Sequence, residues 1–415
     1  MRGTPVVLVL ALARLGGIAE ANDAPSYVGP AACSSNNCHG SVTPRLDSER
    51  SLQNEYVTWY KSDRHAKAYD SLLTERGLRI ARLLGMVQGP ATAASWLENA
   101  RQPERCLDCH ALKLPGEPKL KPGDGVSCEA CHGPAGPWLT QHTERGWEPA
   151  KSIALGMRET MDPGKAADIC LGCHFGTATR TVDHEMLAAG HPSLVFELDA
   201  FSANMPVHWR ENSSNRRWFR GGAWAAGQAV ALRESAQRMA RDARERAWLD
   251  FSVYECSSCH HDLRQPSWRQ ERGYPGRRPG TPPLDTSQQA LFALLARAVA
   301  PAESGRVAEN VLERIRATSL DEETVRGLQH AIVDQAEPLA FAGFRTAQQT
   351  AWALDALAVA RQGLLSGRED DQDPLRLRIG ALFGLLRDPA AYDPARFAAA
   401  VRALRPALPS GGAAR

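Results

Sequence analysis

The sequence has almost no net charge, and it contains no apolar segment long enough to span a membrane. Its 49 basic and 47 acidic residues leave a formal charge of +2. A surface that binds nucleic acid needs a marked excess of basic residues, so we expect no nucleic-acid partner. The best internal apolar segment, ALFALLARAVA, is interrupted by Arg297 and falls short of the roughly 20 residues that a membrane helix requires. We therefore expect no integral membrane span in the mature chain.

No cysteine is left outside a closely spaced pair. The ten cysteines form five pairs, and a histidine directly follows the second cysteine of every pair. The first pair is Cys33 and Cys38, followed by His39, with four residues between the cysteines. The other four pairs have the spacing C-x-x-C-H: Cys106, Cys109 and His110; Cys128, Cys131 and His132; Cys170, Cys173 and His174; and Cys256, Cys259 and His260.

The spacing C-x-x-C-H is typical of c-type haem attachment, in which two thioethers hold the porphyrin and the adjacent histidine ligates iron. Zinc ribbons and disulfides also use closely spaced cysteines. A tetrahedral zinc site built from two C-x-x-C pairs does not need a histidine after each pair, and a disulfide framework gives no reason for histidine at all. With only 12 histidines in 415 residues, five out of five pairs favour covalently bound haem iron.

The expanded first pair is interpreted as a fifth haem site. The two extra residues between Cys33 and Cys38 must loop out, and the intervening serines and asparagines accept a tight turn. Gly40 adds conformational freedom directly after His39. Otherwise Cys33 and Cys38 would be the only thiols without a role. The sequence thus predicts five covalently attached haem c groups.

The N-terminus has the features of a secretory signal peptide. Arg2 precedes an apolar run from Pro5 to Ala13, and small residues follow at Ala19 and Ala21. A buried N-terminal helix is the alternative, but export agrees with covalent haem attachment. We expect a cleaved signal peptide at residues 1–21 and a periplasmic mature protein.

The remaining chain divides into two regions of different composition. Residues 22–282 carry every cysteine and eleven of the twelve histidines, which predicts a pentahaem cytochrome c domain rich in loops. One long helix is expected from about Ala223 to Val253, with the last motif at its C-terminal end.

Residues 283–415 have helical apolar spacing, which predicts a small all-α bundle. Five helix starts are predicted there: capping boxes at Asp285, Ser319 and Thr346, and a cap residue before proline at Asp373 and Asp393. The fold class is therefore mainly α with extensive loops.

Seven histidines remain after the five attachment histidines, and they decide whether each haem has a second axial ligand. His330 lies within a predicted helix of the bundle and is interpreted as structural. Methionines such as Met186 are substitutes of lower rank. His184 and His191 are seven residues apart and would share one helix face if the helix continues to Gly190. The candidate second ligands are His65, His142, His184, His191, His208 and His261.

The motifs together resemble the cytochrome c-552/c-554 family of multihaem cytochromes. The resemblance covers roughly residues 27–263 and includes CHGP, CLGCH, VDHEMLAAGHPSLVFELD and the final CHHDL. It implies closely stacked haems with mostly bis-histidine iron, and its type member is a tetrahaem periplasmic carrier with one haem that lacks a sixth protein ligand. This sequence departs from the family in its five motifs and in the spacing of Cys33 and Cys38.

The function expected from these features is the transfer of single electrons between redox partner proteins. The alternative is an oxidoreductase with one open haem that acts on a small nitrogen or sulfur compound such as nitrite, hydroxylamine, nitric oxide or tetrathionate. Related nitrite reductases often mark the open haem with C-x-x-C-K, which does not occur here. A purely structural protein would give no reason for five redox centres. We expect no catalytic residue.

Overall fold

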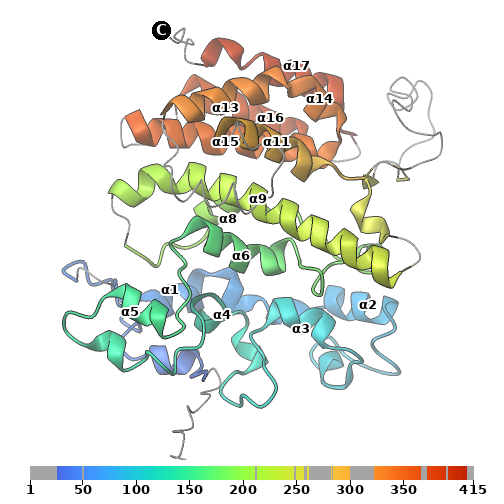
Figure 1. Cartoon of the computed structure of the whole chain (residues 1–415). Coiled ribbons are helices and arrows are strands. Elements are labelled where there is room, and N and C mark those ends of the chain that lie inside the picture. The colour runs from blue at the N-terminus through green and yellow to red at the C-terminus, as the bar shows by residue number, and fades with distance from the viewer. Residues whose placement is uncertain are drawn as a thin grey trace, which may run out of the picture.

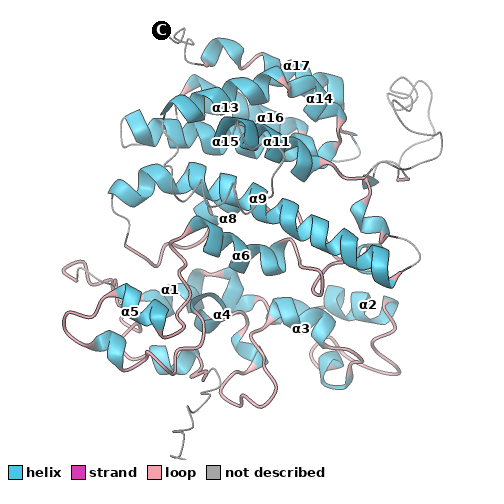
Figure 2. Ribbon diagram, in the orientation of Figure 1, coloured by secondary structure: helices cyan, strands magenta, loops and turns pink. Residues whose placement is uncertain are grey.

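The computed structural model describes residues 26–48, 51–210, 213–246, 249–256, 259–260, 282, 284–299, 322–365, 372–388 and 391–408. Helices joined by loops make up these ranges, and they contain no strand beyond a single antiparallel bridge between Tyr254 and Leu284 (Figure 2). The expected mainly α fold class is therefore confirmed. No helix in the described ranges is long and apolar enough to cross a membrane. The expected signal peptide, the predicted helix start at Ser319 and the candidate ligand His261 lie outside the described residues.

The N-terminal half consists of short helices separated by long loops (Figure 1). Three of these helices end at the attachment histidine of a C-x-x-C-H motif. Gly133, which follows His132, adopts φ 79°, and a side chain there would press on the carbonyl of Gly156. The helices are α1 (Glu55–Ser62), α2 (Glu75–Leu83), α3 (Glu104–His110), α4 (Cys128–His132), α5 (Pro149–Ala154), α6 (Pro163–His174), α7 (His184–Ala188) and α8 (Leu198–Ala203).

The long helix α9 (Ser213–Glu245) lies between the two halves of the molecule (Figure 1). It packs against α6 and α8 on the side of the motifs and against α11 (Ser287–Val299) and α15 (Phe344–Leu365) on the other side. Buried alanines such as Ala223 and Ala226 allow this close approach, and Trp224 fills the core on the bundle side. The predicted bounds of this helix are wrong. The helix begins earlier and ends at Glu245, and the chain reaches the last motif through a 3₁₀ turn, Phe251–Val253.

The C-terminal half is a helical bundle around a core of leucine, alanine and isoleucine. Asp373 and Asp393 accept hydrogen bonds from the first backbone N–H groups of their helices, so both predicted Asp-Pro starts are confirmed. The predicted start at Thr346 is wrong, because α15 already begins at Phe344. The remaining helices are α13 (Glu322–Asp334), α14 (Ala336–Phe341), α16 (Pro374–Leu385) and α17 (Pro394–Arg402).

Candidate haem sites

Four attachment histidines each face a second histidine from a distant part of the chain. The ring centroids of His39 and His142 are 6.2 Å apart, with the ring planes within 5° of parallel. The Nε2 atoms of His65 and His174 are 3.5 Å apart, and their ring centroids 5.8 Å. The centroids of His110 and His191 are 6.4 Å apart, and those of His184 and His260 are 6.3 Å apart.

These separations fit two imidazoles that bind one metal from opposite sides. Two metal–imidazole bonds of about 2 Å in line, with each ring centre about 1 Å behind its nitrogen, place the centroids about 6 Å apart. All four pairs lie close to this value. The facing histidines therefore have the separation that two axial ligands of one iron require, and each attachment histidine directly follows the second cysteine of its pair.

The fifth attachment histidine, His132, lies within electrostatic range of His208 and of His39. Burial lowers the pKa of His132 to about 4, and the charges of His208 and His39 act in the same direction. Its Nδ1 is buried without a hydrogen-bond partner. Burial likewise lowers the pKa of His174 to about 4, with His65 and His110 contributing. Both imidazoles are thus neutral at pH 7, and the neutral form is the one that binds metal.

Hydrogen bonds at Nδ1 orient the rings of six of these histidines. Metal-bound histidines usually donate their second N–H to a carboxylate or carbonyl, which fixes the ring and leaves the other nitrogen for the metal. Here Nδ1 of His39 lies 2.8 Å from Glu55, and Nδ1 of His65 lies 2.9 Å from Asp63. Backbone carbonyls take the same role for the others, namely His110 with Ala68, His142 with Leu139, His191 with Pro192 and His208 with Pro206.

The points at which the local helices end determine which attachment histidine each candidate ligand faces. Helix α1 ends at Ser62, and Asp63 is extended and caps the 3₁₀ turn Arg64–Lys67 that contains His65. His65 therefore lies in this 3₁₀ turn and outside the helix that contains Trp59. Helix α7 ends at Ala188, and Gly190 adopts φ 106°. His184 and His191 consequently face two different attachment histidines, and the prediction that they share one helix face is wrong.

The comparisons with known proteins agree with this geometry. Residues 32–133 match the family model described as cytochrome c554 and c-prime. The matched residues contain the first three of the five cysteine pairs and the histidines that follow them. The chain is also 42% identical over 53 residues to the multiheme cytochrome MtrA of Shewanella baltica (strain OS185), and this match covers 13% of the chain and 14% of that relative. No solved structure matches. Multihaem cytochromes carry covalently bound haem c and transfer electrons.

Sequence reasoning missed a buried carboxylate inside the third motif. Glu129 lies between Cys128 and Cys131 and is only 2% exposed. Its carboxylate accepts hydrogen bonds from the backbone N–H groups of Val28, Gly29 and Ala135, at 3.0, 2.8 and 2.8 Å. The residue therefore ties the chain before the first motif to the third motif. The sequence signal that could have identified Glu129 is an acidic residue between two attachment cysteines.

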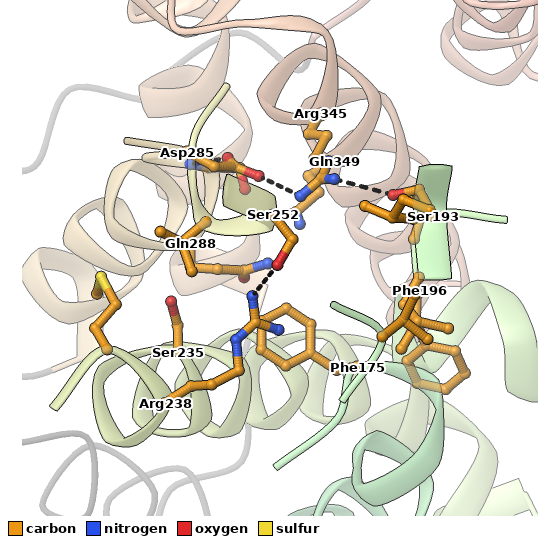
Figure 3. A pocket seen from close by; sticks show the side chains of 17 residues that line it. Phe175, Ser193, Phe196, Ser235, Arg238, Ser252, Asp285, Gln288, Arg345 and Gln349 are labelled. Carbon is orange, nitrogen blue, oxygen red and sulfur yellow. Dashed lines mark hydrogen bonds and ion pairs between the residues drawn. The ribbon is translucent and has the colours of Figure 1, made fainter. Parts of the chain in front are cut away.

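The fifth motif contacts the C-terminal bundle. A cavity of about 60 Å³ lies between α9, α11, α15 and the segment around Ser193. Figure 3 shows the side chains that line it, among them Arg238 and Arg345. Arg345 Nη1 lies 2.9 Å from Asp285 Oδ2, and its Nη2 lies 3.6 Å from Cys256 Sγ. The contact with Cys256 links the start of α15 to the fifth attachment site.

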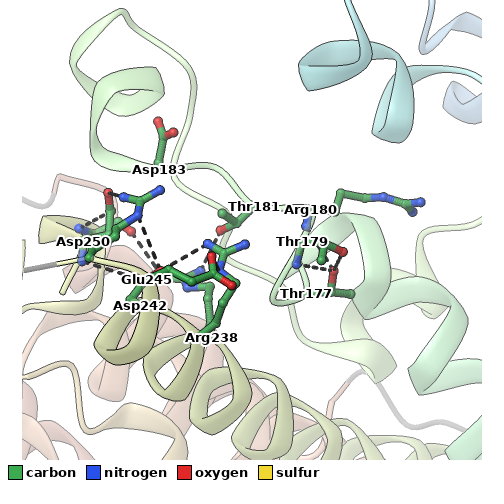
Figure 4. A network of polar contacts seen from close by, with 12 residues as sticks. Thr177, Thr179, Arg180, Thr181, Asp183, Arg238, Asp242, Glu245 and Asp250 are labelled. Atoms are coloured by element: carbon green, nitrogen blue, oxygen red, sulfur yellow. Dashed lines mark hydrogen bonds and ion pairs between the residues drawn. The ribbon is translucent and has the colours of Figure 1, made fainter. Parts of the chain in front are cut away.

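A polar network beside this cavity anchors His184. Asp250 accepts a hydrogen bond from the backbone N–H of His184 at 3.1 Å and lies within 3.4 Å of Arg246. Arg238 donates to the hydroxyl groups of Thr181 and Ser252 (Figure 4). Hydrogen bonds from Ser252 and His184 and the charge of Arg246 lower the pKa of Asp250 despite burial. The network joins α9 to the segment that carries His184.

Proposed function

We propose that the chain binds five covalently attached haem c groups, each between two histidines, and passes single electrons between redox partner proteins in the periplasm. We number the centres one to five by the order of their attachment histidines. The proposed axial pairs are His39 with His142, His110 with His191, His132 with His208, His174 with His65, and His260 with His184.

The observation that carries this proposal is the second histidine that faces four of the five attachment histidines. An electron carrier needs iron with two strong axial ligands in both oxidation states. The coordination of such an iron changes little when one electron is added. The carboxylates of Glu55 and Asp63 bond to Nδ1 of His39 and His65, respectively. These bonds fix the orientation of both rings. Haem supplies the one-electron couple, and the chain supplies ligands, orientation and partial exclusion of water.

The attachment cysteines fit the same proposal. None of the ten forms a disulfide, and each second cysteine directly precedes its attachment histidine. Cys33 and Cys38 are brought together by a turn in which the backbone N–H of Cys38 bonds to the carbonyl of Ser35, and that of His39 to the carbonyl of Cys33. The four intervening residues are therefore accommodated as a compact turn, which supports a haem at the first motif.

An enzyme with an open haem would need one attachment histidine without a partner ligand. In the described residues four of the five attachment histidines face a second histidine, and His132 lies within electrostatic range of His208, which supports the carrier. The fully reduced protein should therefore show no change in its absorption spectrum when carbon monoxide is added, since carbon monoxide binds ferrous haem only at an open position. A spectral change that titrates to one haem in five would contradict the carrier and support the enzyme.

A further inference from the structure

We propose that the five centres form a single line in the order one, three, four, two, five, and that electrons enter and leave at the two ends, centres one and five. This inference rests on the proposed haem sites. It uses contacts between residues of different motifs, each of which places two haem edges side by side. Four such links connect the five centres, and each link has its own contacts.

Centres one and three are joined through their attachment cysteines. The thiols of Cys33 and Cys128 lie within interaction range of each other. The carboxylate of Glu129, next to Cys128, binds the backbone of Val28 and Gly29 just before the first motif. The two attachment segments therefore form one unit although almost 100 residues separate them.

Centres three and four are joined through Asp63 and the segment that precedes the third motif. The backbone N–H of Val126, two residues before Cys128, donates to the carbonyl of His65 at 2.9 Å. Asp63 is 5% exposed, and its carboxylate accepts a hydrogen bond from His65 and also lies within electrostatic range of His208. One buried carboxylate thus serves the second ligands of both centres.

Centres four and two are joined by a second contact between cysteines. The thiols of Cys109 and Cys173 lie within interaction range of each other. Cys173 Sγ also lies 3.9 Å from the carbonyl oxygen of Asp108 and 3.5 Å from Nη1 of Arg180. The guanidinium group of Arg180 interacts with both thiols. The thioether edges of these two haems therefore lie against each other.

Centres two and five are joined through helix α7 and the residue before it. His184 faces His260 of centre five, and seven residues later His191 faces His110 of centre two. Arg105, which directly precedes the second motif, forms a 2.9 Å ion pair with Asp183, which directly precedes His184. The fifth centre therefore continues the line beyond centre two, on the side that contacts the C-terminal bundle through Arg345.

Exposure of the attachment cysteines identifies the ends independently. Cys38 of the first motif is exposed, and so are both cysteines of the fifth motif, Cys256 and Cys259. The six cysteines of the second, third and fourth motifs are buried or half-buried. Electron exchange with a partner protein weakens steeply with distance, so the centres whose edges reach the surface are the ones that a partner can use. The exposed cysteines belong to the two centres that the contacts place at the ends.

Iron–iron distances in a structure of the holoprotein test the order directly. We expect the shortest distances between centres one and three, three and four, four and two, and two and five. A nearest neighbour of centre five other than centre two, or a branched arrangement, would overturn the line. A motif without haem, or an iron without its second histidine, would instead overturn the proposed haem sites, so the two failures are distinguishable.

Removal of one centre tests the ends in solution. The double substitution Cys256→Ala with Cys259→Ala removes an end, and Cys170→Ala with Cys173→Ala removes an interior centre. In redox titrations followed by electron paramagnetic resonance, loss of centre five should shift the midpoint potential of one remaining haem, whereas loss of centre four should shift two. If the two variants had the same number of haems with a shifted midpoint potential, the assignment of the ends would be contradicted.

Discussion

The Nε2 atoms of His65 and His174 lie 3.5 Å apart although 109 residues separate the two histidines in the sequence. His174 ends helix α6, whereas His65 lies in a 3₁₀ turn held by Asp63. Phe196 stacks on the ring of His174 at 4.7 Å between centroids and limits its rotation. The two rings are therefore positioned by separate elements, as two axial ligands of one iron must be.

Loss of a second ligand should open one haem. In His65→Ala the iron of centre four keeps only His174, so one haem in five should become high-spin in the oxidised protein. The spin state is measured by low-temperature electron paramagnetic resonance. His330→Ala is the matched control, because His330 lies in α13 of the bundle and is assigned to no haem. The assignment of His65 fails if both variants keep the spectrum of the native protein.

Loss of the first attachment pair should remove one haem and leave four. Cys33→Ala with Cys38→Ala eliminates both thioethers of centre one, whereas the other four motifs keep theirs. Intact-mass spectrometry should find the native protein heavier than the processed chain by five haems and the variant by four. A native excess of only four haems would show that the expanded motif does not bind haem.

The attachment motifs could be recognised from the sequence because each is local, with all three side chains inside eight residues. The Asp-Pro helix starts at Asp373 and Asp393 were also predictable, since a cap depends on the next few residues alone. The axial pairs could not be predicted, because they join segments that meet only in the folded chain. The turn at Gly190 is an example. His184 and His191 have the spacing of one helix face, but because of this turn they face different attachment histidines.

The carboxylate of Glu129 should contribute strongly to stability. Glu129→Gln loses the charge that accepts hydrogen bonds from Val28, Gly29 and Ala135, and hydrogen bonds to a charged group are worth about 1.5–3 kcal/mol each. We expect a free energy of unfolding lower by about 2 kcal/mol or more, measured by chemical denaturation of the holoprotein. Glu104→Gln, an exposed residue just before the second motif, should change it by less than about 0.5 kcal/mol. Similar losses in both variants would contradict the role of Glu129.

Gly343 should be required where the bundle meets the fifth motif. It adopts φ 137°, and a Cβ there would come within 2.4 Å of the carboxylate of Glu255, next to Cys256. Gly343→Ala should therefore lower the free energy of unfolding by at least about 1 kcal/mol. Gly380→Ala, in an open position of α16, should instead raise it by about 0.5–1 kcal/mol. Thermal denaturation of both variants tests this, and a neutral result at Gly343 would contradict the close contact.

Glu197 should make stability depend on pH. Burial and the neighbouring Asp199 raise its pKa to about 8 from the ordinary 4.5, against hydrogen bonds from the backbone of Ala200 and Asp199 and the charge of Arg220. The folded protein thus keeps a proton that the unfolded chain releases, so this contribution to stability is complete below pH 4.5 and is lost as pH rises through about 8. The melting temperature of Glu197→Gln should fall less between pH 6 and 9 than that of the native protein. Parallel curves would contradict the raised pKa.

The measurement that tests the central claim most directly is low-temperature electron paramagnetic resonance of the oxidised holoprotein, integrated against total haem. The account predicts only low-spin ferric signals, which together account for five haems per chain, because every iron has two histidine ligands. A high-spin signal near one haem in five would contradict it. That result would reveal an open face, and nitrite, hydroxylamine and nitric oxide would then be the first compounds to test as ligands.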